Sequence, residues 1–142
     1  MAVPGRFKLH AAGLQLQMVE VNRTSGPDVY DKWVELEVHI KVPNFSGVIR
    51  WSALQKELLT LASDLERLNS EVGHEHTVHF TSTEPGLTLR LHMNTRGQID
   101  ATYRFSDSSA GPGGPELSGS CTLDQTYLAP MAASLAALAQ AS

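Results

Sequence analysis

The chain has 142 residues, of which 42% are hydrophobic and 18% charged, so its composition excludes a disordered protein. This length fits a single domain covering residues 1–142. The formal net charge is −4, and the sequence has no run of Lys and Arg, which argues against nucleic acid as a partner.

The cysteine content and the hydropathy of the sequence bear on the compartment in which the protein resides. A single cysteine, Cys121, excludes an internal disulfide. No apolar run approaches the ~20 residues that cross a bilayer, and no signal-peptide core follows Arg6 and Lys8. The sequence therefore predicts a cytoplasmic protein without a membrane partner.

The first half of the chain alternates between apolar and polar residues in four segments, which predicts antiparallel strands with one buried face. In the second segment the apolar phase changes after Met18, which predicts a β-bulge near that residue. A helix follows, because leucines recur at intervals of three and four up to Leu68. Ser52 and Gln55 fit a capping box at its start. The four segments are about Phe7–His10, Leu14–Val21, Trp33–Val42 and Ser46–Trp51.

The second half repeats this order of elements. Leu128, Met131, Leu135 and Leu138 predict the closing helix. Asp124 is expected to cap a short turn, with the regular helix beginning near Pro130, because proline is poorly tolerated further inside. The four strands before it are about His76–Thr81, Leu87–Met93, Ile99–Ser106 and Leu117–Leu123.

These elements predict an α+β fold with two similar halves, residues 7–70 and 76–140. Each half has about four antiparallel strands followed by one helix, and the helices pack on one face of the sheet or sheets. Gly13 matches Gly86 before equivalent strands, and Gly47 matches Gly119. The alternative is that any two segments of strands followed by a helix look alike.

Catalytic and metal-binding patterns are weak. His74 and His76 would share one face of a strand, but His79 would point to the other face, so these histidines are poor metal candidates. Cys121 alternates with apolar residues and should face the core, where a thiol is inert. No nucleophile elbow or phosphate-binding glycine loop is present. We therefore expect no catalytic residue, metal or cofactor.

Polar side chains on the exposed strand faces are the candidates for binding a partner protein. Trp33 falls in phase with one such face, and aromatic side chains are enriched at interfaces. The alternative interpretation is an ordinary solvated face. The candidate partner-binding residues are Tyr30, Trp33, Glu35, Glu37, His39, Arg90, His92 and Arg104.

Several segments together resemble the WapI-type bacterial immunity proteins and related uncharacterised bacterial proteins. They are the Trp33 strand, the Phe45-Ser46-Gly47 turn, the Leu-rich helix to Leu68, and Leu123-Asp124-Gln125-Thr126-Tyr127-Leu128. The resemblance covers roughly Leu14 to Leu138. It implies a small cytoplasmic protein that neutralises a toxin by binding it, without catalysis. Asp124 and Tyr127 also have structural interpretations, as a helix cap and a buried ring.

The leading hypothesis is a non-enzymatic binding protein of bacterial origin whose partner is a protein, such as a toxin domain. The main alternative is a small-molecule-binding or enzymatic domain with a pocket between sheet and helices. A third is a homo-oligomer in which the small residues of a helix from Met131 to Ala141 pack against a second copy.

Overall fold

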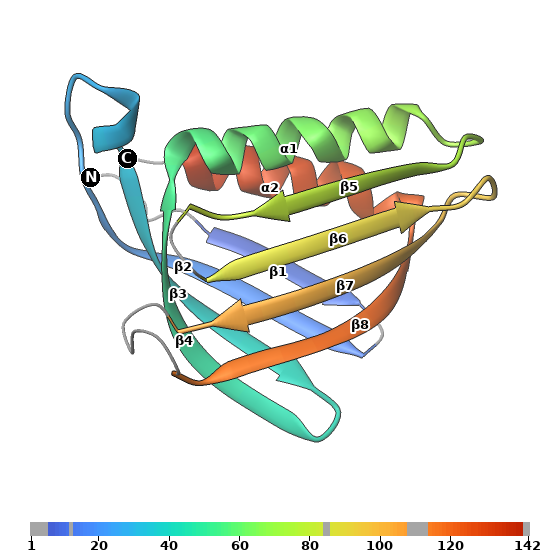
Figure 1. Ribbon diagram of the computed structural model, residues 1–142, viewed down its shortest axis with the longest axis horizontal. Helices are drawn as coiled ribbons and strands as arrows, with labels where there is room; N and C mark the ends of the chain where they lie inside the picture. Colours follow the sequence, from blue (N-terminus) through green and yellow to red (C-terminus); the bar gives the residue numbers. More distant parts are fainter. Residues whose placement is uncertain (1–5, 12, 84–85, 108–113, 141–142) are drawn as a thin grey trace.

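A computed structural model describes residues 6–11, 13–83, 86–107 and 114–140 (Figure 1). They form two four-stranded antiparallel sheets in which each strand pairs with the next one along the chain. Each sheet is followed by one helix, as the sequence predicts. The elements are β1 (Arg6–Ala11), β2 (Leu14–Arg23), β3 (Trp33–Val42), β4 (Phe45–Leu54), α1 (Gln55–Ser70), β5 (His76–Thr81), β6 (Leu87–Met93), β7 (Gln98–Ser106), β8 (Glu116–Asp124) and α2 (Leu128–Gln140).

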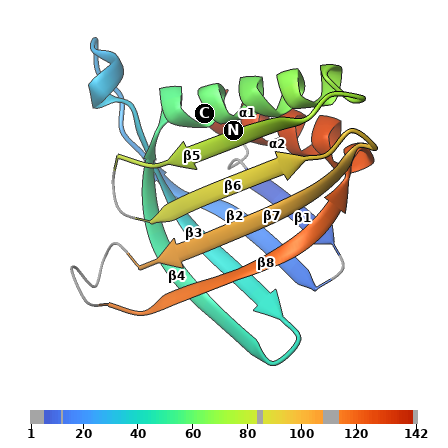
Figure 2. The ribbon, with the colours of Figure 1, turned by 45° about the vertical axis from the view of Figure 1, so that its right-hand side comes forward.

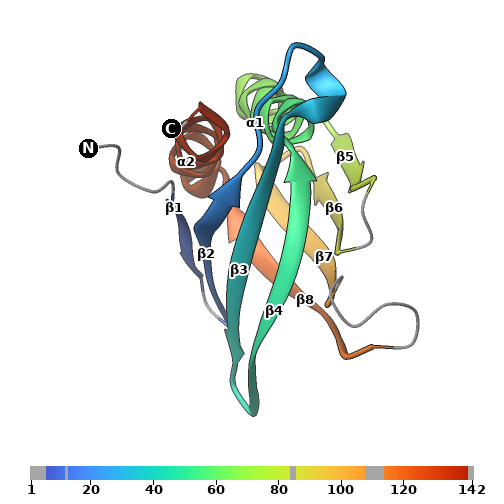
Figure 3. The same ribbon diagram turned by 90° about the vertical axis from the view of Figure 1, so that its left-hand side faces the viewer.

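The two sheets face each other with their strands crossing, and both helices lie along one side of this pair (Figures 1 and 3). Helix α1 packs alongside α2, but α1 also contacts β5 of the second sheet, and α2 contacts β1 of the first. Each helix therefore covers an edge strand of the other half. Apolar residues from both sheets and both helices form one shared core.

Strand β3 shows how alternation places the polar residues on the surface. Val34, Leu36 and Val38 are fully buried, whereas Glu35 and Glu37 lie on the opposite face and remain partly accessible. The β3–β4 hairpin extends beyond the end of the second sheet (Figure 2). The alternation therefore predicts correctly which side chains β3 presents outward.

The β-bulge lies further along β2 than the sequence suggests. The register with β3 shifts between Glu20 and Asn22, so Val21 is the extra residue, and the prediction near Met18 was wrong in position. Met18 still pairs with Val38 in regular register. The phase was misplaced because Val19, although apolar, lies in register with Glu37 on the outward face.

Helix α1 is not capped by Ser52, contrary to the sequence prediction. Strand β4 continues to Leu54, and Ser52 lies opposite Glu35 within the sheet. The third helical residue, Glu57, instead accepts a hydrogen bond from the backbone N–H of Leu54 at 3.1 Å. Its other carboxylate oxygen accepts one from the backbone N–H of Thr83 at 2.7 Å. Glu57 therefore ties the start of α1 to the segment that follows β5.

The start of the closing helix confirms the expected short turn. A 3₁₀ turn, Gln125–Tyr127, follows β8, and the Asp124 side chain accepts a hydrogen bond from the backbone N–H of Thr126 at 2.8 Å. Helix α2 begins at Leu128, so Pro130 occupies its first turn, where a missing N–H costs no helical hydrogen bond. Ala141, expected in this helix, lies outside the described residues.

The Asp124 cap predicts a pH-dependent contribution to stability. Hydrogen bonds from the hydroxyl and backbone N–H of Thr126 lower the pKa of Asp124. A lowered folded-state pKa means that the stabilisation is present above the unfolded-state pKa and is lost as the pH falls through the folded-state value. We expect Asp124→Ala to be less stable than wild type at pH 7, with the difference shrinking below pH ~4. Urea unfolding at pH 7 and pH 3 measures it, and an unchanged difference would contradict the assignment.

No helix within the described ranges is both long enough and apolar enough to cross a membrane.

Candidate functional site

The predicted partner-binding residues separate onto two surfaces. Because the apolar faces of the sheets point toward each other, their polar faces lie on opposite sides of the molecule (Figure 3). The structure therefore brings together the members of each group but does not join the groups. The first sheet and the loop before β3 carry Tyr30, Trp33, Glu35, Glu37 and His39, and the second sheet carries Arg90, His92 and Arg104.

The outward residues of β3 and β4 form a connected ionic network. Arg50 contacts Glu35 at 3.5 Å and Glu37 at 3.3 Å, and Glu37 contacts the His39 Nε2 at 2.7 Å. The four side chains are about one-third to two-fifths exposed, so water screens these pairs and each contributes little to stability. The network therefore places two carboxylates side by side on the face of the sheet without stabilising the fold appreciably.

Tyr30 and Trp33 form an aromatic corner at one end of this face. The Trp33 indole donates a hydrogen bond to the Tyr30 carbonyl oxygen at 2.9 Å. The ammonium of Lys56 lies 4.3 Å from the centre of the Tyr30 ring, within cation–π range. The Tyr30 side chain remains 61% exposed. The corner is therefore anchored through Trp33, and Tyr30 presents its ring to solvent.

The outward face of the second sheet has a different character. Thr77, Thr102, Ser118 and Ser120 occupy it between the charged residues. His92 accepts or donates a hydrogen bond with the Thr77 hydroxyl at 2.8 Å and lies 3.3 Å from Glu75. Arg104 pairs with Glu116 at 2.8 Å, and this contact raises the Arg104 pKa. Short polar side chains dominate the remaining surface of this sheet.

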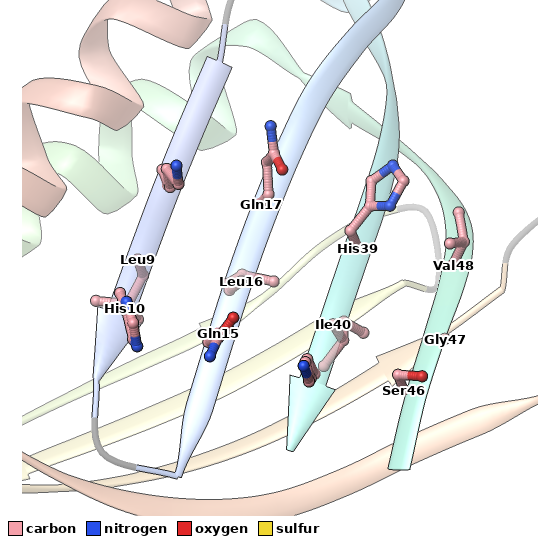
Figure 4. A pocket seen from close by; sticks show the side chains of 12 residues that line it. Leu9, His10, Gln15, Leu16, Gln17, His39, Ile40, Ser46, Gly47 and Val48 are labelled. Carbon is pink, nitrogen blue, oxygen red and sulfur yellow. The ribbon is translucent and has the colours of Figure 1, made fainter. Parts of the chain in front are cut away.

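A groove of about 370 Å³ crosses the outward face of the first sheet (Figure 4). Two neighbouring rows of outward side chains form its floor, each row running from β1 to β4. We call this feature the basic groove, because none of its lining residues is Asp or Glu and it contains two lysines and two histidines. The first row is Lys8, Gln17, His39 and Val48, and the second is His10, Gln15, Lys41 and Ser46.

The space between the sheets and helices contains a cavity of about 40 Å³ lined by apolar side chains, Tyr103 and Cys121. That volume holds about one water molecule, which leaves no room there for a substrate. Cys121 faces this core as expected, and burial raises its thiol pKa. The reactive thiolate is therefore disfavoured.

The histidines after α1 do not converge. His76 Nδ1 lies 3.0 Å from Glu71, and His79 is on the outward face of β5, opposite in phase to His76. In the ranges that the structure describes, no three His, Cys, Asp or Glu side chains are placed to hold a metal ion.

Of the basic groove, only His39 was among the predicted site residues. Lys41 lies on β3 with His39, the others lie on β1, β2 and β4, and each single strand shows only ordinary alternation. Lys8 and His10 had a detectable signal, since they alternate with buried residues of β1. Nothing in the sequence, however, indicates that Lys8 lies in the same row as His39, two strands away.

The small residues of α2 have a partner within the chain. This helix packs along α1, and its Ala132 and Ala139 are buried. Their size is therefore explained by the contact between the two helices.

Comparison with known proteins gives one family match. No curated protein and no solved structure matches the sequence significantly. The WapI-like immunity protein family matches residues 6–141, nearly the whole chain. This match agrees with the resemblance noted in the strands, the turn after Val42 and the segment before α2. The chain therefore belongs to the WapI-like immunity protein family.

Proposed function

We propose that this chain neutralises a protein toxin by binding it directly, without catalysis, through the outward face of the first sheet. Membership of an immunity protein family supports a toxin as the partner. The small apolar cavity argues against a substrate site between sheets and helices, because a substrate needs a larger space with converging polar groups.

The distribution of exposed apolar side chains carries the choice of surface. Among the described residues, five large apolar side chains are more than two-fifths exposed. Four of them, Val21, Tyr30, Phe45 and Val48, lie on strands of the first sheet or in the loop before β3. Phe45 has the phase of the inward residues of β4 and is exposed in the β3–β4 hairpin, so the outward face is marked by Val21, Tyr30 and Val48. The fifth, Val72, lies in the turn after α1, so the second sheet contributes none. Exposed aromatic side chains such as Tyr30 are enriched at protein interfaces, which supports the first sheet as the binding surface.

The two sheets provide a matched test of this choice. Genes adjacent to that of this chain are screened for a toxin domain, which then serves as the probe, and the affinity is measured by isothermal titration calorimetry. We expect the double variant Tyr30→Ala/Val48→Ala to weaken binding about tenfold or more, because exposed tyrosine side chains are frequent hot spots and Val48 adds an exposed apolar contact on the same sheet. The control Arg90→Ala/Arg104→Ala, on the second sheet, should stay within about twofold of wild type.

A reversed ranking, with the arginine variant losing affinity and the Tyr30→Ala/Val48→Ala variant retaining it, would move the interface to the second sheet. Absence of a complex with the wild-type chain would contradict toxin binding by this pair. Circular dichroism of each variant measures whether the fold is retained, which we expect because Tyr30 and Val48 are both more than half exposed.

A further inference from the structure

The basic groove is a local exception to the charge of the molecule. The chain has a net charge of −4, yet Lys8, Lys41, His10 and His39 line this groove without an acidic neighbour in the lining. Lys8 and His10 lie on β1, and His39 and Lys41 lie on β3. The strand register places these four side chains in two adjacent rows. A positive site on a negative protein favours an anionic ligand locally.

We propose that the basic groove binds an acidic, extended segment of the partner protein. This inference rests on the proposed function, because the segment belongs to the bound toxin. The groove has a sheet as its floor, and its side chains stand in rows that cross β1 to β4 (Figure 4), which suits a polypeptide lying across the strands. Gln17 lies between Lys8 and His39, and Gln15 lies between His10 and Lys41, where their amides can donate hydrogen bonds to carboxylates or peptide carbonyls.

The dimensions agree with such a segment. Lys8 and Lys41 lie on strands two apart, a lateral separation of about 10 Å. Alternate side chains of an extended chain are spaced at about 7 Å, so two or three acidic residues reach both lysines. Val48, which is 54% exposed, adds an apolar contact at the β4 end of the groove.

The rest of the face orients the segment. Glu35 and Glu37 lie beside the groove, toward the start of β3, where they pair with Arg50, and Glu37 also contacts His39 at 2.7 Å. An acidic stretch is therefore attracted to one end of the outward face and repelled from the other. Such an arrangement fixes the register of a bound partner more than it raises affinity.

The test uses the full chain with a hexaglutamate peptide as the probe and a hexaglutamine peptide as the neutral reference. Backbone amide chemical shifts in NMR spectra report which residues respond. We expect saturable shifts confined to the residues of the basic groove, with hexaglutamate only. The charge-reversal variant Lys8→Glu/Lys41→Glu should weaken peptide binding about tenfold or more.

The matched control is Arg67→Glu/Arg96→Glu, which changes the net charge by the same amount at two exposed positions outside the groove. We expect this control to change peptide affinity by less than about threefold. Equal losses in the two variants would show attraction by net charge alone and would overturn the proposal. Displacement of the peptide by an equal concentration of inorganic phosphate would also overturn it, in favour of a small-anion site.

The same variants separate this inference from the proposed function. If the toxin binds Lys8→Glu/Lys41→Glu as tightly as wild type, the groove proposal fails and toxin binding stands. If hexaglutamate binds the groove but no toxin candidate forms a complex, the proposed function fails instead.

Discussion

Replacing Gly86 with alanine is expected to destabilise the protein by about 2 to 3 kcal/mol, because the new methyl group would overlap the core. A Cβ atom at Gly86 would lie 2.0 Å from Trp51 Cδ1. Trp51 is only 1% exposed and packs edge-on against Phe80, so its indole has no free space to enter. The backbone of Gly86 does not have a positive φ, so the expected penalty is steric alone.

Gly47→Ala is the matched control. Nothing lies within 4 Å of a Cβ built at Gly47, and its backbone also lacks a positive φ. We expect its free energy of unfolding to stay within about 0.5 kcal/mol of wild type. Urea denaturation measures both variants. Equal stabilities of the two variants would contradict the contact. In a Trp51→Leu background the penalty of Gly86→Ala should shrink by about 1 kcal/mol, because the two side chains couple directly.

Arg23→Ala is expected to destabilise the protein by about 2 to 4 kcal/mol. The Arg23 guanidinium donates to the Ala139 carbonyl at 2.8 Å and to the Leu138 carbonyl at 2.6 Å. It also pairs with Glu20 at 2.6 Å, and both charged side chains are less than one-fifth exposed. Helix α2 has no basic residue in its own last turn, so β2 supplies the cation that its C-terminus requires.

The β-bulge makes this contact possible. Glu20 pairs with Leu36 and Arg23 with Val34, so both have the phase of buried residues although they are three positions apart. The extra residue, Val21, produces this change of phase. Arg23→Lys should recover only part of the stability. An ammonium group lacks the planar guanidinium that contacts the Leu138 and Ala139 carbonyls and Glu20 together. The exposed control Arg67→Ala should lower the free energy of unfolding by less than about 0.5 kcal/mol. An equally small loss for Arg23→Ala would contradict the role of Arg23 at the C-terminus of α2.

The strands and helices were predictable because one face of each is buried, so apolar residues recur at regular intervals in the sequence. The same logic failed at two places. The bulge was misplaced because Val19 is an apolar residue on the outward face. Ser52 was assigned to a cap because its side chain suits one, although buried Trp51 and Ala53 on either side continue the strand pattern.

The matching glycines illustrate a second limit of the sequence. The two halves repeat the same order of elements, but Gly13 adopts a positive φ of 82° in the turn before β2, whereas Gly86 is required by its contact with Trp51. Glycine is therefore required at these two equivalent positions for different reasons, backbone conformation at Gly13 and close packing at Gly86.

The candidate site was predictable only in part, since it depends on which strands become neighbours. Alternation identified the outward residues of β3 correctly. It could not show that Arg90 and Arg104 lie on the far side of the molecule, or that Lys8 joins His39 in the basic groove. Those relations follow from the pairing of strands and from the packing of two separate sheets.

Titration of toxin activity against increasing amounts of this chain tests the central claim most directly. Direct neutralisation predicts that activity falls linearly with added protein and reaches zero at a fixed molar ratio, independent of incubation time. Inactivation that continues with time at substoichiometric amounts of this chain would show catalysis and would contradict the account.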